Sequence, residues 1–396
     1  MPDINGRFVE LHVVQAIPFA NLNRDDTNSI KTVTWGGAER TRVSSQCWKR
    51  AMRLHLQQSI GQDALRTRRL AERLTHHLRD QHGWPDDLAE RAGRHVAVAS
   101  SVGAEAPKKK KDADDDGPAD AWLNAAMVYI PDTAIAELAD LAELHREALE
   151  NAKDPAKFDR KHSVIPGTDV DAVLRSRNGV INLFGRMLAQ VDGAHVDGAV
   201  QVAHSFTTHR TDVEIDYFSA VDDVTAAWQD TTGSAHMGQA EHSAGVLYRY
   251  VVLDLHDLHR NLGGALTETH ELADALLRAA LLSLPHAKKN STAPHTIPHL
   301  AHVTVRNDRP VSYAGAFEKP VRADQFGGHS EPSVAALDSY AAAVQRLLGT
   351  NGLTYGGHAT LSDLAPQGLG NRAESFDALI ESALAAALPS AVKEPA

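Results

Sequence analysis

Cysteine is nearly missing from this 396-residue sequence, and long apolar runs are missing altogether. Cys47 is the only cysteine, which excludes a disulfide bond within the chain. No run is long enough to span a bilayer, and the opening MPDINGRFVELHVV lacks the charged, apolar and small-residue parts of a signal peptide. Hydrophobic residues still make up 43% of the sequence, which excludes a disordered chain. We therefore expect a soluble cytoplasmic protein with a large core.

The common sequence signatures of enzymes are also missing. The chain has no CxxC pair, phosphate-cradling glycine loop, nucleophile elbow or Rossmann signature. Its 22 histidines raise the question of a metal site, but the pairs His204/His209 and His236/His242 lack the i,i+4 spacing of helical ligands. We therefore expect no metal, no cofactor and no catalytic residue.

One enzymatic alternative stays open. Asp25 and Asp26 are neighbouring carboxylates, and such a pair can hold magnesium for phosphodiester cleavage. A metal-dependent RNase is therefore the second hypothesis, which incubation with labelled RNA and magnesium would separate from a binding protein. Local pairing with Arg24 or contact with the next subunit is the non-catalytic role expected for the two carboxylates.

The charge of the chain is acidic overall and uneven along its length. The formal charge is -11, but residues 1–60 carry eight Lys/Arg and five Asp/Glu, which leaves +3 there and -14 in the remainder. Net charge alone argues against nucleic acid as a partner. Because screening confines surface fields to roughly 10 Å, a local basic patch can still bind phosphate.

Hydrophobic patterning predicts an α+β protein interrupted by a helical block. The first part contains an expected strand over 8–17, a polar loop over 18–37 and a helix that begins at Ser44 or Ser45. Helices are then expected over 62–82, 85–100 and 121–150, with a charged surface loop over 106–120. Further strands are expected at 179–188, 213–221, 245–255 and 302–307, and further helices at 193–204, 266–284, 333–348 and 373–387.

The stretch RTRVSSQCWKRAMR, residues 40–53, carries five cations and no acid. Trp48, Met52 and Leu56 have the four-residue spacing of a buried helix face, so Lys49 and Arg53 share another face. A helix that begins at Ser44 or Ser45 directs free backbone N–H groups and a positive dipole end toward the preceding loop. Two interpretations remain open, a phosphate-binding site and a solvated basic face.

Several segments of the sequence resemble one known family. NLNRDDTNSIK and WGGAERTRVSSQCWKRAMR are similar to the N-terminal signature of the CasC-type (Cse4) backbone subunit of the type I-E CRISPR Cascade complex. The similarity continues in LFGRM (183–187), VDGAVQVAHSFTTHRTDVEIDYFSAVDD (196–223), GSAHMGQAEHSAGVLYRYVVLDL (233–255), LGGA (262–265) and GAFEKPV (315–321). The segments occur in the family's order and span most of the chain, whereas residues 61–177 match least.

The resemblance implies an RRM or ferredoxin-like palm with helical fingers and a thumb loop, in the shape of a right hand. Residues 1–60 would form the N-terminal part of the palm and 61–177 the fingers insertion. Residues 178–396 would form the rest of the palm, with the thumb near 213–245.

The resemblance also implies a function. The family binds a CRISPR guide RNA (crRNA) without cutting it, forms a helical filament along the guide, and presents the bases for pairing with target DNA in antiviral defence. Its partners would be the crRNA, target DNA through guide pairing, other Cascade subunits and other copies of itself, which the resemblance puts at six. The guide contacts carried over are Arg24, Lys31, Ser44, Gln46, Lys49, Arg50, Arg53 and Met187. Met187 would pack on a base without reading its identity; without the resemblance, a core methionine is the alternative. Neighbouring Arg186 is expected to pair with an acid.

Overall fold

The computed structural model describes residues 4–105, 122–155, 159–221 and 234–389. The expected loop over 106–120 and the expected tip of the thumb therefore lie outside the described residues. The chain divides into two compact units, one of residues 1–56 with 200–396 and the other of residues 57–199. These divisions fall after residues 56 and 199, whereas the sequence boundaries were placed after 60 and 177.

The larger unit is built on a ten-stranded sheet. Its central strand, β1 (Phe8–Ala20), pairs antiparallel with β11 (Ser234–Asp254) on one side and with β12 (Leu300–Arg306) on the other. The strand order is β14-β13-β12-β1-β11-β9-β3-β2, with β8 and β10 also paired to β11. The outer strands are β13 (Leu353–Thr360), β14 (Asn371–Arg372), β8 (Val200–Val202) and β9 (Ser205–Thr207).

A hairpin occupies much of the segment expected to be a loop over 18–37. β2 (Thr32–Trp35) pairs with β3 (Ala38–Val43) across a turn made by Gly36 and Gly37, with φ of +59° and +71°. Positive φ at both central positions matches the right-handed twist of a two-residue hairpin, and glycine adopts it without strain. The loop prediction was therefore wrong for residues 18–20, which end β1, and for residues 32–35. Thr-Val-Thr-Trp favours a strand, but the polar residues before it and the Gly-Gly after it made the whole segment resemble a loop.

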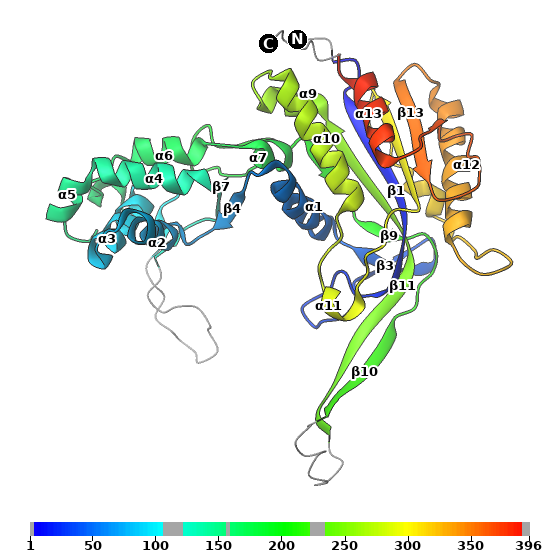
Figure 1. Ribbon diagram of the computed structural model, residues 1–396, viewed down its shortest axis with the longest axis horizontal. Helices are drawn as coiled ribbons and strands as arrows, with labels where there is room; N and C mark the ends of the chain where they lie inside the picture. Colours follow the sequence, from blue (N-terminus) through cyan, green and yellow to red (C-terminus); the bar gives the residue numbers. More distant parts are fainter. Residues whose placement is uncertain (1–3, 106–121, 156–158, 222–233, 390–396) are drawn as a thin grey trace. The chain divides into compact units, whose positions relative to one another are not determined.

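Helices pack on both faces of this sheet (Figure 1). α12 (Ser330–Leu348) and the 3-10 turn η2 (Ala314–Phe317) pack against Val14 and Tyr248 on one face. On the other face, Arg249 donates to the Ala280 carbonyl of α10 (Leu266–Leu282) and lies 4.4 Å from the Trp48 ring of α1 (Ser45–Ile60). The remaining helices of this unit are α9 (Leu255–Asn261), α11 (Lys289–Thr292) and α13 (Phe376–Ala387).

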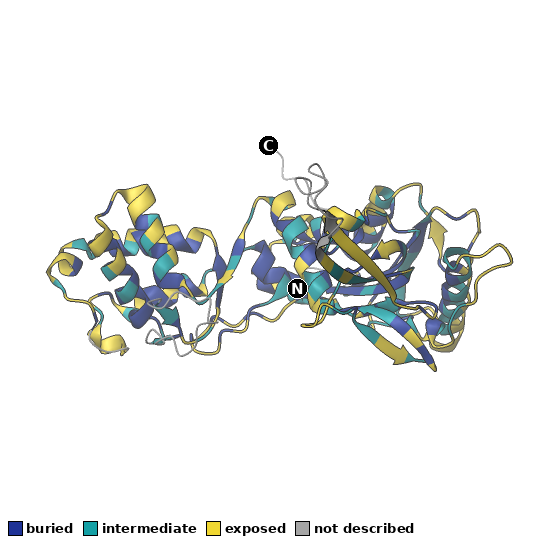
Figure 2. Ribbon diagram, turned by 90° about the horizontal axis from the view of Figure 1, so that it is seen from below, coloured by how far each residue is buried: buried dark blue, intermediate teal, exposed yellow. Residues whose placement is uncertain are grey.

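The smaller unit is mainly helical. Its longer helices are α2 (Leu70–His82), α3 (Asp86–Ala99), α4 (Thr133–Leu144) and α6 (Gly167–Arg175), and its short elements are β5 (Ala104–Glu105), β6 (Leu123–Asn124), α5 (Arg146–Asn151) and η1 (Arg160–His162). Their apolar faces form one core, which includes Leu74, Val96 and Leu138. Figure 2 shows this buried interior in dark blue along the inward helix faces.

Three details of the smaller unit differ from the sequence predictions. β4 (Ala64–Thr67) and β7 (Val128–Pro131) form a two-stranded sheet inside segments that were expected to be helical. α7 (Gly179–Phe184) occupies the expected strand over 179–188, and turns followed by β8 occupy the expected helix over 193–204. Short apolar runs fit a buried strand and a buried helix equally well, so periodicity could not decide between them.

A long hairpin leaves the sheet where β10 (Glu214–Val221) pairs with the first half of β11 (Figure 1). Ile215, Tyr217, Phe218 and Met237 are exposed on this hairpin. Along the described ranges, no helix combines the length and apolarity that crossing a membrane requires.

Candidate nucleic-acid interface

The N-terminus of α1 is fixed by side chains on three separate segments. Ser44 is the N-cap residue, as predicted, because its Oγ accepts a hydrogen bond from the Cys47 N–H at 3.3 Å. The Ser44 N–H donates to Asn23 Oδ1 at 2.8 Å, and the Ser45 N–H donates to His204 Nδ1 at 3.2 Å. The positive end of the helix dipole is thus held at a defined place beside the loop that follows β1.

The exposed side of α1 carries the predicted polar residues. Trp48 and Met52 are buried, as the sequence pattern predicted, and Trp48 Nε1 donates to Ser205 Oγ at 2.7 Å. Gln46 and Arg50 are exposed, and Lys49 and Arg53 are half-buried. Because the buried residues fix the rotation of the helix, these four side chains fall on its opposite side.

Backbone hydrogen bonds hold the loop from Asn23 to Lys31 in place beside β3. The Lys31 N–H donates to the Asn23 carbonyl at 3.3 Å, and the Lys31 carbonyl accepts from the Arg42 N–H at 2.8 Å. The Cys47 thiol has a pKa raised by burial, and the charges of Arg50 and Lys31 act in the opposite direction. Both cations therefore lie within electrostatic range of Cys47, the third residue of α1.

Asp25 closes the tip of this loop. Its Oδ1 accepts hydrogen bonds from the Thr27 N–H, the Thr27 hydroxyl and the Ser29 N–H, and the pKa of the carboxyl is lowered, with the hydroxyl bond as the largest cause. Arg24 is exposed and donates to Asn28 Oδ1 at 2.9 Å, so the expected pairing of Arg24 with these carboxylates is wrong. Over the described residues, no group of three or more His, Cys, Asp or Glu side chains has the arrangement of a metal site.

Arg40 is not part of the exposed cationic surface. Its side chain is fully buried, and it donates to the carbonyls of Thr207 at 2.8 Å and Phe317 at 3.1 Å. The sequence counted Arg40 with Arg42 among the five cations of residues 40–53. On a strand these two residues share one face. The loop before α12 covers Arg40, whereas Arg42 stays half-buried.

Arg42 and His204 form a pair that the sequence did not reveal. Arg42 Nη1 donates to His204 Nδ1 at 3.1 Å, at the same ring nitrogen that accepts from the Ser45 N–H. Burial lowers the pKa of His204, and the charges of Arg42 and Lys31 lower it further. The N–H groups of Arg42 and Ser45 can only donate, so His204 Nδ1 is the acceptor in both hydrogen bonds. The imidazole is therefore neutral and carries its proton on Nε2. No sequence signal could join residues 42 and 204.

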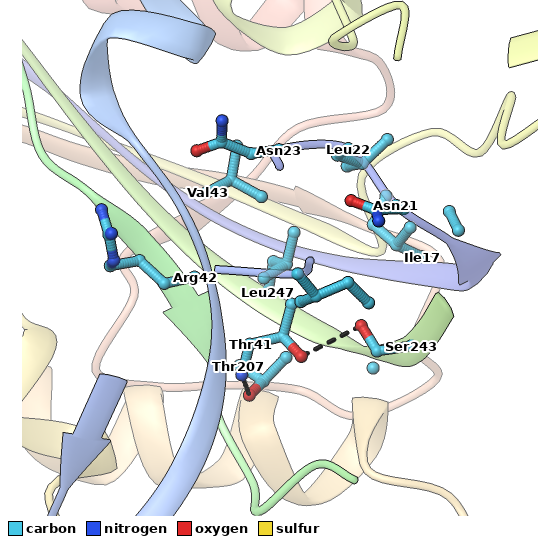
Figure 3. Close-up of a pocket in the computed structure, with 13 residues that line it drawn as sticks. Ile17, Asn21, Leu22, Asn23, Thr41, Arg42, Val43, Thr207, Ser243 and Leu247 are labelled. Atoms are coloured by element: carbon cyan, nitrogen blue, oxygen red, sulfur yellow. Dashed lines mark hydrogen bonds between the residues drawn. The ribbon is translucent and has the colours of Figure 1, made fainter. Parts of the chain in front are cut away.

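The cavity that Arg42 lines in the described structure is too small for a nucleotide. A cavity of about 20 Å³ is lined by Asn23, Thr41 and Ser243 together with apolar side chains, and a space of that size holds about one water molecule. Figure 3 shows the Arg42 side chain pointing away from the other labelled residues of the cavity. A ligand of the cationic groups would therefore lie on the surface.

Met187 belongs to the smaller unit and is 85% exposed. Its backbone is set by Gly185, whose φ of +76° brings it against Gly198, and by paired hydrogen bonds of 2.9 Å between Arg186 and Val196. A projecting methionine on a fixed backbone is unlike a core methionine, which was the alternative to a contact residue.

Arg186 is buried and pairs with no acid among the residues that the structure describes, which corrects the expectation that it forms an ion pair. Its guanidinium donates to the carbonyls of Ala194, Ser176, Arg175 and Tyr129 at 2.7 to 3.3 Å. Two of these carbonyls end α6, where a cation also complements the helix dipole. Burial lowers the pKa of Arg186 to about 10, so the group stays charged at neutral pH.

Together these observations define an α+β protein whose larger unit carries cationic side chains around the start of α1. A sequence model of the CT1975-like protein family, Cas_CT1975, matches residues 9–382. The chain belongs to this family, which is the CasC/Cas7 family, and the resemblance noted in the sequence is thereby confirmed.

Two solved structures are similar over nearly the whole chain. A chain described as "CRISPR RNA-guided surveillance complex, pre-nicking" has 39% identity and a TM-score of 0.86. Another, described as "CRISPR RNA-guided surveillance complex", has 35% identity and a TM-score of 0.75. Each similarity covers 96% of this chain and 100% of the other. No curated protein is similar enough to this chain to count as a match.

Proposed function

We propose that this protein is a non-catalytic subunit that binds a CRISPR guide RNA and forms the backbone of a surveillance complex of the Cascade type I-E class. Copies of the chain would assemble along one guide and present its bases for pairing with target DNA. The partners would be the crRNA, other copies of the chain and other subunits of the complex. Family membership and the two similar structures, which are named as RNA-guided complexes, support this proposal.

The observation that carries the proposal is the cationic surface around the start of α1. A chain of net charge -11 keeps Lys31, Arg42, Lys49 and Arg50 around one structural feature, the start of α1. Point charges and N–H groups bind phosphates without regard to base identity. A guide that is read by base pairing requires this kind of grip, because its base edges must stay accessible.

The order of strands supports an RRM-like palm. β1 is followed by α1, then β9 and β11, then α10 and β12, and the spatial order is β12-β1-β11-β9. A βαββαβ unit of the ferredoxin-like kind has this chain order, with its first strand in the centre of the sheet. The site residues of α1 would then lie at one edge of the palm.

The fingers and the thumb of the proposed hand would be the helical unit and the long hairpin. The helical unit of residues 57–199 would be the fingers, and its projecting Met187 would pack on a guide base. The β10–β11 hairpin would be the thumb, and its exposed Tyr217, Phe218 and Met237 offer apolar surface for RNA or a second copy.

Native mass spectrometry of the chain purified with its RNA tests this function. We expect complexes that contain one RNA and several copies of the chain, with no shortening of RNA after incubation with magnesium. A chain that carries no RNA would refute the binding function. Magnesium-dependent cleavage would instead support the RNase alternative.

A further inference from the structure

We propose that Arg42 is a phosphate contact of this surface and that His204 is the residue that positions it. The inference rests on the proposed RNA-binding function and extends it by two residues that lie outside the sequence-derived contact set. Arg42 lies on β3, directly before the N-cap, and His204 lies between β8 and β9.

The hydrogen bonds assign the roles. His204 Nδ1 accepts from one N–H of the Arg42 guanidinium, and a guanidinium has five N–H donors, so the others remain for a ligand. The Arg42 backbone is also fixed, because its N–H donates to the Lys31 carbonyl at 2.8 Å and the residue pairs with Phe206 of β9. Two constraints on one long side chain reduce the rotamer freedom that would otherwise be lost when a phosphate binds.

The charge around Arg42 also fits an anion. Across the described residues, Arg42 forms no ion pair within 4.0 Å, whereas other arginines of the larger unit, such as Arg278 and Arg306, are paired with aspartates. Its partner is a neutral imidazole that orients the guanidinium without neutralising it. The guanidinium therefore keeps its full charge and a fork of donors, which is the geometry that phosphate oxygens accept.

The choice of side chain at position 204 separates positioning from direct contact. In His204→Asn, the amide oxygen stands near the place of Nδ1 and can still accept from Arg42. In His204→Gln, the amide reaches the place of Nε2 and leaves the place of Nδ1 without an acceptor. His204 is exposed, so these variants are expected to fold, which a thermal melt checks.

The experiment measures binding of a guide RNA to the full chain as a function of salt. Arg42→Ala is expected to lower the salt slope by about 0.7, the value for one phosphate contact on a single strand. His204→Ala should weaken binding about tenfold, as for the loss of one charge-assisted hydrogen bond. It should have no further effect in the Arg42→Ala background, and His204→Asn should restore binding where His204→Gln does not.

Arg210→Ala is the matched control, because Arg210 is exposed on the loop after β9 and already pairs with Asp212 at 3.4 Å. Its salt slope should equal that of the wild type. Additive effects of the two substitutions, or rescue by glutamine alone, would overturn the positioning role. An unchanged slope in Arg42→Ala would overturn the phosphate contact. Failure of the wild type itself to bind RNA would refute the proposed function instead.

Discussion

Replacing Arg186 by alanine tests the buried network that fixes the backbone before Met187. The substitution removes the donors for four carbonyl groups while leaving those groups inside the protein. An unsatisfied buried acceptor costs about 1–3 kcal/mol, and relaxation makes such costs less than additive. Several such acceptors left unsatisfied together therefore cost about 3 kcal/mol. We expect a loss of about this size in the free energy of unfolding of residues 57–199.

Hydrogen exchange of the amides in residues 170–199 measures this loss locally. A change of about 3 kcal/mol lowers their protection roughly a hundredfold. Arg177→Ala is the control, because Arg177 is exposed close to Arg186, and its effect should stay within about 0.5 kcal/mol. If Arg186→Ala loses no more protection than Arg177→Ala, the carbonyls find other donors and the network argument fails.

Further predictions concern the loop after β1 and the buried titratable groups. Asp25→Ala should increase hydrogen exchange in residues 24–31, because the turn loses its acceptor, while an assay with labelled RNA and magnesium should detect no cleavage before or after the change. Burial lowers the pKa of His302 from 6.5 to about 4, so its contribution to stability is complete above pH 6.5 and lost as pH falls through 4, which urea unfolding at pH 7 and 4 measures. Burial raises the pKa of Glu10 from 4.5 to about 7. Its contribution to stability is therefore complete below pH 4.5 and lost as pH rises through 7. Glu10→Gln should remove this loss of stability.

Local patterns predicted local features well. The spacing of Trp48, Met52 and Leu56 gave the buried face of α1, and Ser44 was recognised as an N-cap, because both depend on residues within a few positions. The main strands of the large sheet were also found, since β1 and β12 are rich in β-branched residues. Strand β2 was missed because its four residues, Thr32–Trp35, are too short a run to stand out beside a polar segment and a Gly-Gly turn.

Features that depend on distant contacts could not be predicted. Arg40 and Arg42 have the same local pattern, and only the segment near Phe317 decides that Arg40 is buried. His204 acquires its role from Arg42, which lies 162 residues earlier in the chain. Arg186 satisfies carbonyls rather than an acid, and a sequence does not show which backbone groups a fold leaves unpaired.

The central claim is that the start of α1 grips the guide backbone without reading its sequence. The most direct test measures the salt dependence of binding of two unrelated guide RNAs to the wild type, Lys49→Ala and Arg50→Ala. Arg346→Ala, which removes an exposed arginine of α12, is the control, and circular dichroism checks folding. We predict that each α1 variant lowers the salt slope by about 0.7 for both guides, whereas Arg346→Ala leaves it unchanged. Unchanged slopes in folded Lys49→Ala and Arg50→Ala would contradict the claim and leave this stretch a solvated helix face.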